Sequence, residues 1–460
     1  MSDSPKRVFV GPLVQCSIDR HLEVVENAAI EVDKDGFVIS VTALDSLPST
    51  EYLKSNNVTI LPTGSFLVPG LIDLHYHAPQ LPQAGTNLHI PLHDWLTTTT
   101  LPLEAKYANT QFAETVFEKV VKRTLGHGTT TAVYFATKHR DSAKILASCC
   151  IKAGQRALVG KVCMDNKEMC LCTKESLCTC TETTTESIHE TRTFLEEMVS
   201  LTKSCNSRVE PVVTPRFVPS CSPHLLTQLG SLSQEFNAHV QSHAWESDWQ
   251  VEYGEQNRNG RDLDLFQNHN LISKQGTVFA HSVHANDSEI KQLAHHQIGV
   301  AHCPLSNAFF ANGIMPARLM LEAGVPVGLG TDVGGAWSSS ILDSCRQAVT
   351  SSRILRDGVG KLRGARNGPC SHPAEINHVD AFWMATVGGG LALKKKIGRI
   401  APGYKFDALV VDVHAPNSNI DSFDSLVDTI ETKFQKFVYL GDDRNIRQVY
   451  VDGICVLDKQ

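Results

Sequence analysis

The sequence predicts an α/β protein: a (β/α)8 TIM-like barrel with a small flanking β-sandwich domain built from both termini. Three observations lead to this prediction. Between Leu67 and Asp332, short apolar runs alternate with segments of helical periodicity. There are eight such runs, the number that closes a parallel sheet into a barrel. The two ends of the chain instead carry short strands of alternating polarity, which are typical of antiparallel sheets.

The eight runs are nearly continuous in apolar residues, as expected for strands that are buried on both faces. They comprise residues 67–73, 129–135, 157–164, 209–216, 239–243, 277–281, 298–302 and 325–332. Between them, the segment from Phe112 to Leu125 has apolar residues at three- and four-residue spacing, which predicts an amphipathic helix. No Gly-x-Gly-x-x-Gly turn follows the first run, so a dinucleotide-binding sheet is disfavoured.

We expect residues 66–395 to form the catalytic barrel. Residues 1–65 and 396–460 contain further candidate strands, but neither portion is long enough to bury a sheet alone. We therefore predict that the two terminal portions pair in space as one β domain. Their candidate strands comprise residues 28–32, 36–41, 406–412 and 448–456.

The composition is that of a folded globular protein: 460 residues, of which 20% are charged and 42% hydrophobic. A formal net charge of −7 does not favour binding to nucleic acid or to an anionic membrane. No stretch of eighteen apolar residues is present, and the first residues lack the apolar core of a signal peptide. We therefore expect a cytoplasmic protein without a nucleic-acid or membrane partner.

The 14 cysteines are mostly scattered through apolar segments, where a free cysteine packs as a small core residue. The exception is Cys170-x-Cys172-x5-Cys178-x-Cys180. Paired Cys-x-Cys units can bind a soft metal as thiolates. The favoured interpretation is an exposed insert that the cytosol keeps reduced.

Five residues of metal-ligand type lie at the C-terminal ends of predicted barrel strands, where this fold forms its active sites. His75 and His77 lie one residue apart, and an extended strand points such residues to the same face. The other three are His243, His281 and Asp332. Such a set, rich in nitrogen and with one carboxylate, fits one Zn²⁺ per chain, with Fe²⁺ as the alternative.

A proton carrier is also expected beside the metal. Glu246 follows His243 by three residues, which brings its carboxylate back over the metal without making it a ligand. A solvated glutamate at a helix start is the alternative interpretation. Asp332 combines the roles of ligand and of base for a water proton.

These residues resemble those of the metal-dependent amidohydrolase superfamily. The pattern is Pro69-Gly-Leu-Ile-Asp-Leu-His75-Tyr-His77, followed by His243, His281 and Gly330-Thr-Asp332. Within the superfamily the chain is similar to the eukaryotic-type guanine deaminases over nearly its whole length. The motifs that carry this similarity are His75-x-His77-Ala-x-Gln80, Val213-Thr-Pro-Arg216-Phe217, Val240-Gln-Ser-His243-x-x-Glu246 and Ala301-His-Cys-Pro-x-Ser-Asn307.

The resemblance implies a homodimeric zinc enzyme of purine catabolism or salvage that hydrolyses guanine to xanthine and ammonia. It implies that Glu246 transfers protons and that His281 and Asp332 act on the attacking water. The substrate-binding residues implied are Gln80, Arg216, Phe217, His243, Glu246, His281 and Asp332, and the zinc ligands are His75, His77, His243, His281 and Asp332. An amide and a guanidinium suit the polar edges of guanine, and an aromatic ring suits its face.

The sequence departs from the family pattern at residues expected around the entrance to the substrate site. They are Pro79, residues 81–85, the residues after Glu246 and the cysteine-rich insert. Three rival functions stay open. One is a related mononuclear hydrolase acting on an aminotriazine, cytosine or an adenosine derivative. Another is a dinuclear amidase bridged by carboxylated Lys161, and the third is an inactive scaffold of the same fold. The cytidine-deaminase fold is excluded, because the chain has no Pro-Cys-x-x-Cys.

Overall fold

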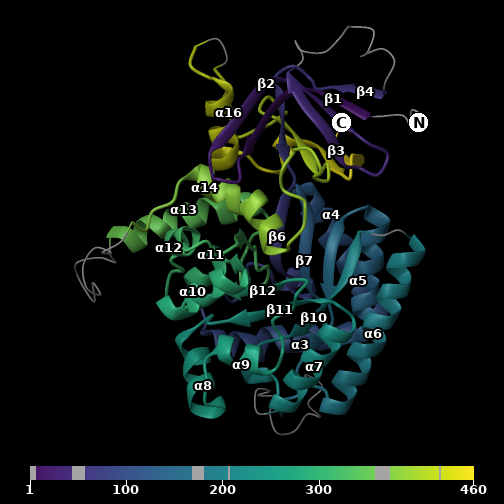
Figure 1. Ribbon diagram of the computed structural model, residues 1–460, viewed down its shortest axis with the longest axis vertical. Coiled ribbons are helices and arrows are strands. Elements are labelled where there is room, and N and C mark those ends of the chain that lie inside the picture. The colour runs from purple at the N-terminus through teal and green to yellow at the C-terminus, as the bar shows by residue number, and fades with distance from the viewer. Residues whose placement is uncertain are drawn as a thin grey trace.

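The computed structural model describes residues 7–43, 57–167, 181–205, 208–357, 373–423 and 426–459. It contains two sheets, one above the other in Figure 1. The lower one is a nearly closed barrel of eight parallel strands surrounded by helices, and the upper one joins the two ends of the chain. The predicted fold class is therefore confirmed. The insert from Cys170 to Cys180 lies outside the described residues.

The barrel strands follow one another around the sheet in the order in which they occur in the chain. They are β6 (Leu71–His77), β7 (Thr129–Phe135), β8 (Arg156–Gly160), β10 (Val209–Pro215), β11 (His239–Ala244), β12 (Thr277–His281), β13 (Gly299–His302) and β14 (Val327–Leu329). The short β9 (Val162–Cys163) runs parallel to the end of β10. Two predicted runs, 129–135 and 277–281, match their strands to the residue.

The barrel closes between β6 and the segment that follows β14. The backbone N–H of Asp332 donates to the carbonyl of His75 over 2.8 Å. Asp73 reinforces this contact, because its carboxylate accepts from the Thr331 N–H at 3.0 Å and from the Thr331 hydroxyl at 2.6 Å. The first and last strands of the barrel thereby bring their ligand-type residues side by side.

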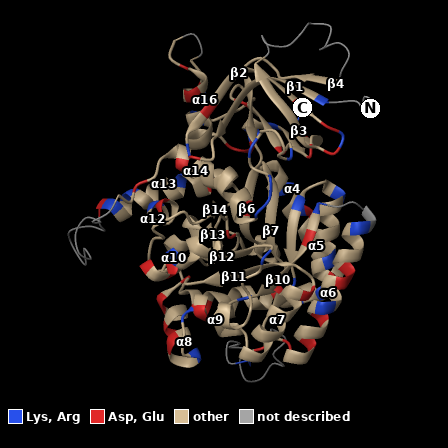
Figure 2. Cartoon of the chain, viewed as in Figure 1, with Lys and Arg blue, Asp and Glu red and all other residues tan. Residues whose placement is uncertain are grey.

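Helices cover the outside of the barrel, and charged side chains of both signs lie on the outer ones, such as α6 (Figure 2). The predicted helix 112–125 is found as α4 (Thr110–Gly126), which begins where the Asn109 side chain accepts from two backbone N–H groups. The others include α5 (Arg140–Ala153), α6 (Thr184–Cys205), α7 (Pro223–Glu235), α8 (Asp248–Arg258), α9 (Asp262–Asn268), α10 (Asp287–His296), α11 (Pro304–Phe310), α12 (Ala317–Glu322), α13 (Ile341–Asp357), α14 (His378–Trp383) and α15 (Gly389–Ala392).

Two short helices lie in the segment between β6 and α4. They are α2 (Leu92–Trp95) and α3 (Leu101–Ala105), and a single π-helical turn over residues 96–100 joins them. None of the helices in the described parts of the chain has both the length and the apolarity needed to cross a bilayer.

The upper sheet confirms that the two terminal portions pair in space. Its strands are β1 (Arg7–Cys16), β2 (Leu22–Val32), β3 (Val38–Ala43), β4 (Asn57–Ile60), β5 (Ser65–Pro69), β15 (Ala408–Asp412), β16 (Ile446–Val451) and β17 (Ile454–Asp458). The pairing of β5 with β15 joins the N-terminal to the C-terminal portion. The sheet has an apolar core of its own, in which the rings of Phe9 and Phe406 stack at 4.3 Å. The helix α16 (Ile430–Leu440) lies beside β2 (Figure 1).

The first predicted strand, 67–73, is wrong in one respect: it spans two strands of different sheets. The break is at Gly70, whose N–H donates to the carbonyl of Asp407 over 2.9 Å. A Cβ at residue 70 would lie 2.2 Å from the Thr130 hydroxyl oxygen, so only glycine fits there. As a consequence His75 and His77 lie within β6 rather than after it. The division at residue 66 stays a prediction, and the place of β5 favours a division at Gly70.

Charged groups tie the upper sheet to the start of the barrel strands. The guanidinium of Arg156, the first residue of β8, donates to both carboxylate oxygens of Asp407 over 3.1 Å and to Asp452 over 2.6 Å. The sheet therefore lies at the N-terminal ends of the strands. The opposite end, where the ligand-type residues are, remains open for a site.

Candidate metal and substrate site

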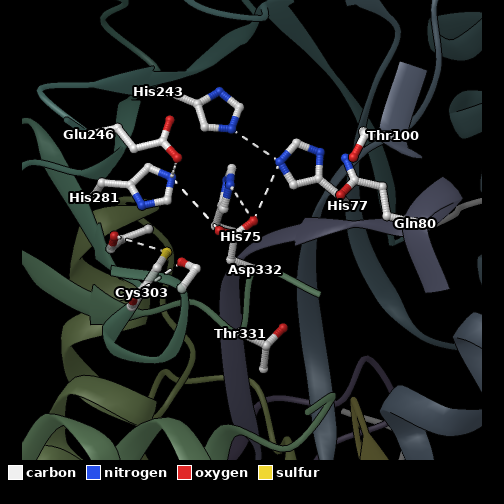
Figure 3. A network of polar contacts seen from close by, with 12 residues as sticks. His75, His77, Gln80, Thr100, His243, Glu246, His281, Cys303, Thr331 and Asp332 are labelled. Atoms are coloured by element: carbon white, nitrogen blue, oxygen red, sulfur yellow. Dashed lines mark hydrogen bonds and ion pairs between the residues drawn. The ribbon is translucent and has the colours of Figure 1, made fainter. Parts of the chain in front are cut away.

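The five predicted metal ligands converge at the C-terminal ends of the barrel strands (Figure 3). The ring atoms Nε2 of His77 and His243 lie 3.1 Å apart. One carboxylate oxygen of Asp332 lies 3.3 Å from His75 Nε2 and 3.5 Å from His77 Nε2. Its other oxygen lies 3.9 Å from His281 Nε2. Five side chains from β6, β11, β12 and the segment after β14 thus point at one spot.

The hydrogen bonds behind two of the rings orient their nitrogens. His243 Nδ1 lies 2.6 Å from the carbonyl of Arg216, and His281 Nδ1 lies 2.9 Å from the side-chain oxygen of Asn307. Both partners accept, so each Nδ1 carries the proton and each Nε2 keeps a lone pair. Metal-binding histidines are commonly oriented in this way.

Buried atoms without partners show that these residues fit a metal ion. The Nε2 atoms of His75 and His281 are buried and have no hydrogen-bond partner, although buried polar atoms are normally paired. Burial and the neighbouring imidazoles hold the pKa of His77 and of His243 well below the usual value. Imidazoles that direct their Nε2 atoms at one spot beside a carboxylate form a donor set that a cation satisfies.

The carboxylate of Asp332 remains ionised in this cluster. Burial alone would raise its pKa, but the imidazoles of His75, His281 and His77 hold it well below the usual range. A charged oxygen donor is thus available beside the nitrogens.

The backbone is strained at two of the five positions. His281 has a φ of 73° and Asp332 a φ of 51°, both in the left-handed region that side chains other than glycine avoid. Such residues cost on the order of 1–3 kcal/mol each and persist where the surrounding structure requires them. Here the turn at each strand end directs the side chain toward the other ligands.

Glu246 lies beside the cluster, as the sequence predicts. It follows β11, and its Oε1 lies 3.7 Å from His281 Nε2. Its side chain is 13% exposed, and burial raises its pKa above the usual value. The carboxyl group is therefore able to gain and lose a proton next to the cluster.

A cavity opens in front of these residues. Its volume is about 420 Å³ when the space open to solvent is included. Six of the seven predicted substrate-binding residues line it, namely Gln80, Arg216, Phe217, His243, Glu246 and Asp332, whereas His281 is not among the lining residues. The metal-ligand residue His77 also lines it, as do the apolar residues Leu92, Leu96, Trp95 and Phe310.

Neighbouring residues hold the aromatic ring of Phe217, which lines the cavity, in place. Phe217 forms a parallel β-bridge with His243, and its ring lies 6.3 Å from the His243 ring and 6.1 Å from that of Trp249. An aromatic ring held in this way can stack on a flat heterocycle.

Four residues of the site were not singled out from the sequence. Asn307 and Phe135 stand inside quoted or predicted segments, so a signal for them existed. Phe135 ends β7, and its ring lies 4.8 Å from those of His75 and His243. Asp73 also stands inside a quoted motif, between Pro69 and His77, but its partner Thr331 is distant in the chain. Glu104 has no such signal, because it acts through Arg216, which is also distant in the chain.

Lys161, the residue that a dinuclear amidase would carboxylate, points elsewhere. Its Nζ donates to Glu182 over 2.8 Å and to the carbonyl of Val162 over 3.3 Å. It does not line the cavity of the cluster. This arrangement favours a single metal ion.

The chain resembles known proteins over almost its whole length. The amidohydrolase family model matches residues 66–456. Guanine deaminase of Dictyostelium discoideum is 35% identical over 97% of this chain and 97% of its own. Guanine deaminase of Homo sapiens is 37% identical over 97% of this chain and 95% of its own. The crystal structure of guanine deaminase from C. acetobutylicum with guanine in its active site matches with a TM-score of 0.85 and 30% identity, over 98% of this chain and 100% of that one.

Proposed function

The chain belongs to the amidohydrolase family, and on this basis we propose that it hydrolyses guanine to xanthine and ammonia. One observation carries the proposal: the Gln80, Arg216 and Phe217 side chains line the same cavity as the histidine–aspartate cluster. A heterocycle in this cavity would lie within reach of the hydrogen-bonding side chains of Gln80 and Arg216 and of the proposed metal ligands. Relatives that match over nearly the whole chain are guanine deaminases, and one solved structure among them holds guanine in its active site.

We propose one zinc ion per chain, held by His75, His77, His243, His281 and Asp332. The donor set supports this choice, because imidazole nitrogen with one carboxylate suits Zn²⁺, with Fe²⁺ as the alternative. When bound, zinc supplies Lewis acidity that lowers the pKa of a water to about 7.

The residues of the chain supply the proton transfers. Asp332, ionised and strained, takes a proton from the attacking water, which His281 helps to hold in place. Glu246, whose pKa is raised, protonates N3 of guanine, then takes the second proton of the former water and gives it to the departing amine. The proton left on Asp332 returns to Glu246 through solvent for the next cycle. The bond from C2 to the amino nitrogen breaks, the water oxygen becomes the 2-oxo group of xanthine, and the nitrogen leaves as ammonia. Such acid–base catalysis contributes roughly 10²–10⁴-fold.

Three residues orient the purine in this proposal. Arg216 carries several N–H donors in a fixed plane and suits the oxo group and ring nitrogens of guanine. The Gln80 amide adds an acceptor for an N–H group. Phe217 offers an aromatic face to the ring system.

The decisive experiment measures ammonia release from guanine, cytosine, adenosine and an aminotriazine, with metal content determined on the same sample. We expect turnover of guanine with about one zinc ion per chain. Preferential turnover of another ring would identify a related hydrolase instead. Absence of turnover on every ring, with metal bound, would identify an inactive scaffold.

We also propose that the chain forms a homodimer in the cytoplasm, as the resemblance implies. Light scattering on the purified protein tests the oligomeric state. A monomeric mass across a range of concentrations would refute the dimer.

A further inference from the structure

Glu104 connects the two polar residues that the proposed function assigns to the purine. It lies in α3, and its side chain is only 9% exposed. Its Oε2 accepts from Arg216 Nη1 over 2.6 Å, and its Oε1 accepts from Arg216 Nη2 over 3.2 Å. The same Oε1 accepts from Gln80 Nε2 over 2.9 Å. One buried carboxylate therefore binds a guanidinium with both oxygens and an amide with one.

The bond to Glu104 determines which way the Gln80 amide faces. An ionised carboxylate only accepts hydrogen bonds, so the NH₂ group of Gln80 is the end that turns toward it. The amide oxygen of Gln80 is left on the other side, buried and without a hydrogen-bond partner. A buried acceptor of this kind is costly unless a ligand supplies a donor.

Gly334 provides the room for that oxygen. A Cβ at residue 334 would lie 2.1 Å from Gln80 Oε1, and the φ of +110° at this glycine is one that other residues rarely adopt. The amide is thus held between Glu104 on one side and a glycine backbone on the other. It cannot rotate freely to present its NH₂ group to a substrate.

The same carboxylate also aligns the guanidinium of Arg216. A bidentate contact uses one edge of the guanidinium and holds its plane. The remaining N–H groups stay available in the cavity that Arg216 lines. The site then offers one fixed acceptor and one fixed set of cationic donors.

We propose that Glu104 is a positioning residue that selects purines bearing an oxo group beside an N–H edge. The inference rests on the proposed function, because it concerns how guanine is recognised. Glu104 touches neither substrate nor metal and acts through Gln80 and Arg216. A purine without the oxo group forms fewer hydrogen bonds with the aligned Gln80 and Arg216, so their alignment affects its binding less.

The alternative is that Glu104 only neutralises the buried charge of Arg216. The two roles differ in the steady-state constants and in substrate preference. Alignment affects KM for guanine and discrimination against 2-aminopurine, which carries the reacting amine but no 6-oxo group. Charge neutralisation alone affects stability and leaves this discrimination unchanged.

The experiment compares Glu104→Gln and Glu104→Asp with the wild type. The glutamine has the same shape, but its NH₂ group faces one of the two donors. The aspartate keeps the charge for Arg216 but is too short to hold both partners. For both variants we expect KM for guanine to rise about 10- to 100-fold, as for the loss of hydrogen bonds to a charged group, with kcat changed only a few-fold. KM for 2-aminopurine should change only a few-fold.

Two further variants complete the test. Asp380→Asn is the matched control, a buried carboxylate paired with Arg318 at 2.7 Å outside the cavity; it should lower Tm but leave KM unchanged. Combining Glu104→Asp with Gln80→Ala should raise KM by much less than the product of the single effects. A Glu104→Asp variant with normal KM and normal discrimination would refute the positioning role. Wild-type protein that releases no ammonia from guanine would instead refute the proposed function.

Discussion

At the scale of single residues, hydrogen bonds at Nδ1 orient two of the proposed metal-binding histidines. His243 and His281 each donate from Nδ1 to a fixed oxygen, which leaves Nε2 for a metal. Glu246 is the proposed proton carrier and not a proposed ligand, and its Oε1 lies 3.7 Å from His281 Nε2. The separation of binding groups from the proton carrier leads to two predictions.

The first prediction concerns Glu246. Glu246→Gln keeps the size of the side chain but cannot carry a proton, so kcat for guanine should fall roughly 10²–10⁴-fold. Metal content and Tm should stay at wild-type values, because the carboxylate is not a proposed ligand. Glu252→Gln, an exposed change in the neighbouring α8, serves as the control and should have normal kcat. A Glu246→Gln variant with near-normal kcat would reject the proton-carrier role.

The second prediction concerns Asn307, whose side-chain oxygen holds the proton on His281 Nδ1. Asn307→Ala releases the ring, and loss of such a partner typically weakens metal affinity or activity 10- to 100-fold. Competition with a fluorescent chelator measures the zinc affinity directly. An unchanged affinity would mean that the barrel alone orients His281.

At the scale of elements, the sequence predicted best the bounds of the barrel strands and the residues at their C-terminal ends. The runs 129–135 and 277–281 became strands with the same bounds, and each begins directly after a glycine, Gly128 and Gly276. His75 and His77 share a face because they lie two residues apart in β6. Local patterns of this kind are readable without a structure.

Contacts between distant elements were not readable. The break at Gly70 depends on Thr130 in a neighbouring strand. The Pro69-Gly70 pair is a turn signal within the predicted run, but it does not show that the chain passes from one sheet to another. Glu104 stands in a short helix with no motif, and its partner Arg216 is 112 residues away. Side chains that act through tertiary contacts leave no periodic signal in the sequence.

The third prediction concerns Asp73, which joins β6 to the segment after β14. Asp73→Ala would leave the Thr331 N–H buried without its acceptor and remove the bond to the hydroxyl. The free energy of unfolding should fall by about 2–4 kcal/mol, and zinc occupancy should fall because Asp332 follows directly. Urea denaturation and metal analysis measure the two effects.

Thr331→Val is the matched comparison for that variant. It removes the 2.6 Å hydroxyl bond but keeps the shape and the backbone N–H, so the loss should be only about 1 kcal/mol. Equal losses in the two variants would show that the backbone bond to Asp73 contributes nothing to closure.

At the scale of the whole molecule, the two ends of the barrel have different tasks. The C-terminal ends of the strands hold the cluster and the cavity, whereas the N-terminal ends meet the sheet built from both termini (Figure 1). Arg156, Asp407 and Asp452 join sheet and barrel at that second end. Changes there should alter stability and leave catalysis intact.

The fourth prediction tests this division with Asp452→Asn. Asparagine tolerates the left-handed φ of 49° at this residue but loses the charge that pairs with Arg156 and Arg208. The free energy of unfolding at pH 7 should fall by roughly 3 kcal/mol, as when a buried ion pair loses one member. kcat/KM for guanine should stay within about twofold of the wild type, since catalysis is at the other end. The exposed Asp357→Asn, also paired with an arginine, should cost less than about 1 kcal/mol.

The pKa of Asp452 predicts how the stability difference between wild type and Asp452→Asn changes with pH. Burial alone would raise the pKa of Asp452, but the charge of Arg156 and the hydrogen bonds from Arg208 and Arg156 hold it below its usual value of 3.8. A carboxylate with a depressed folded-state pKa stabilises the fold above the unfolded value, and this stability is lost as the pH falls through the folded-state pKa. The stability gap between wild type and Asp452→Asn should thus be constant from pH 7 to about pH 5 and should narrow below pH 3.8. A gap that persists undiminished at lower pH would show that Asp452 acts through hydrogen bonds that asparagine cannot replace and not through its charge.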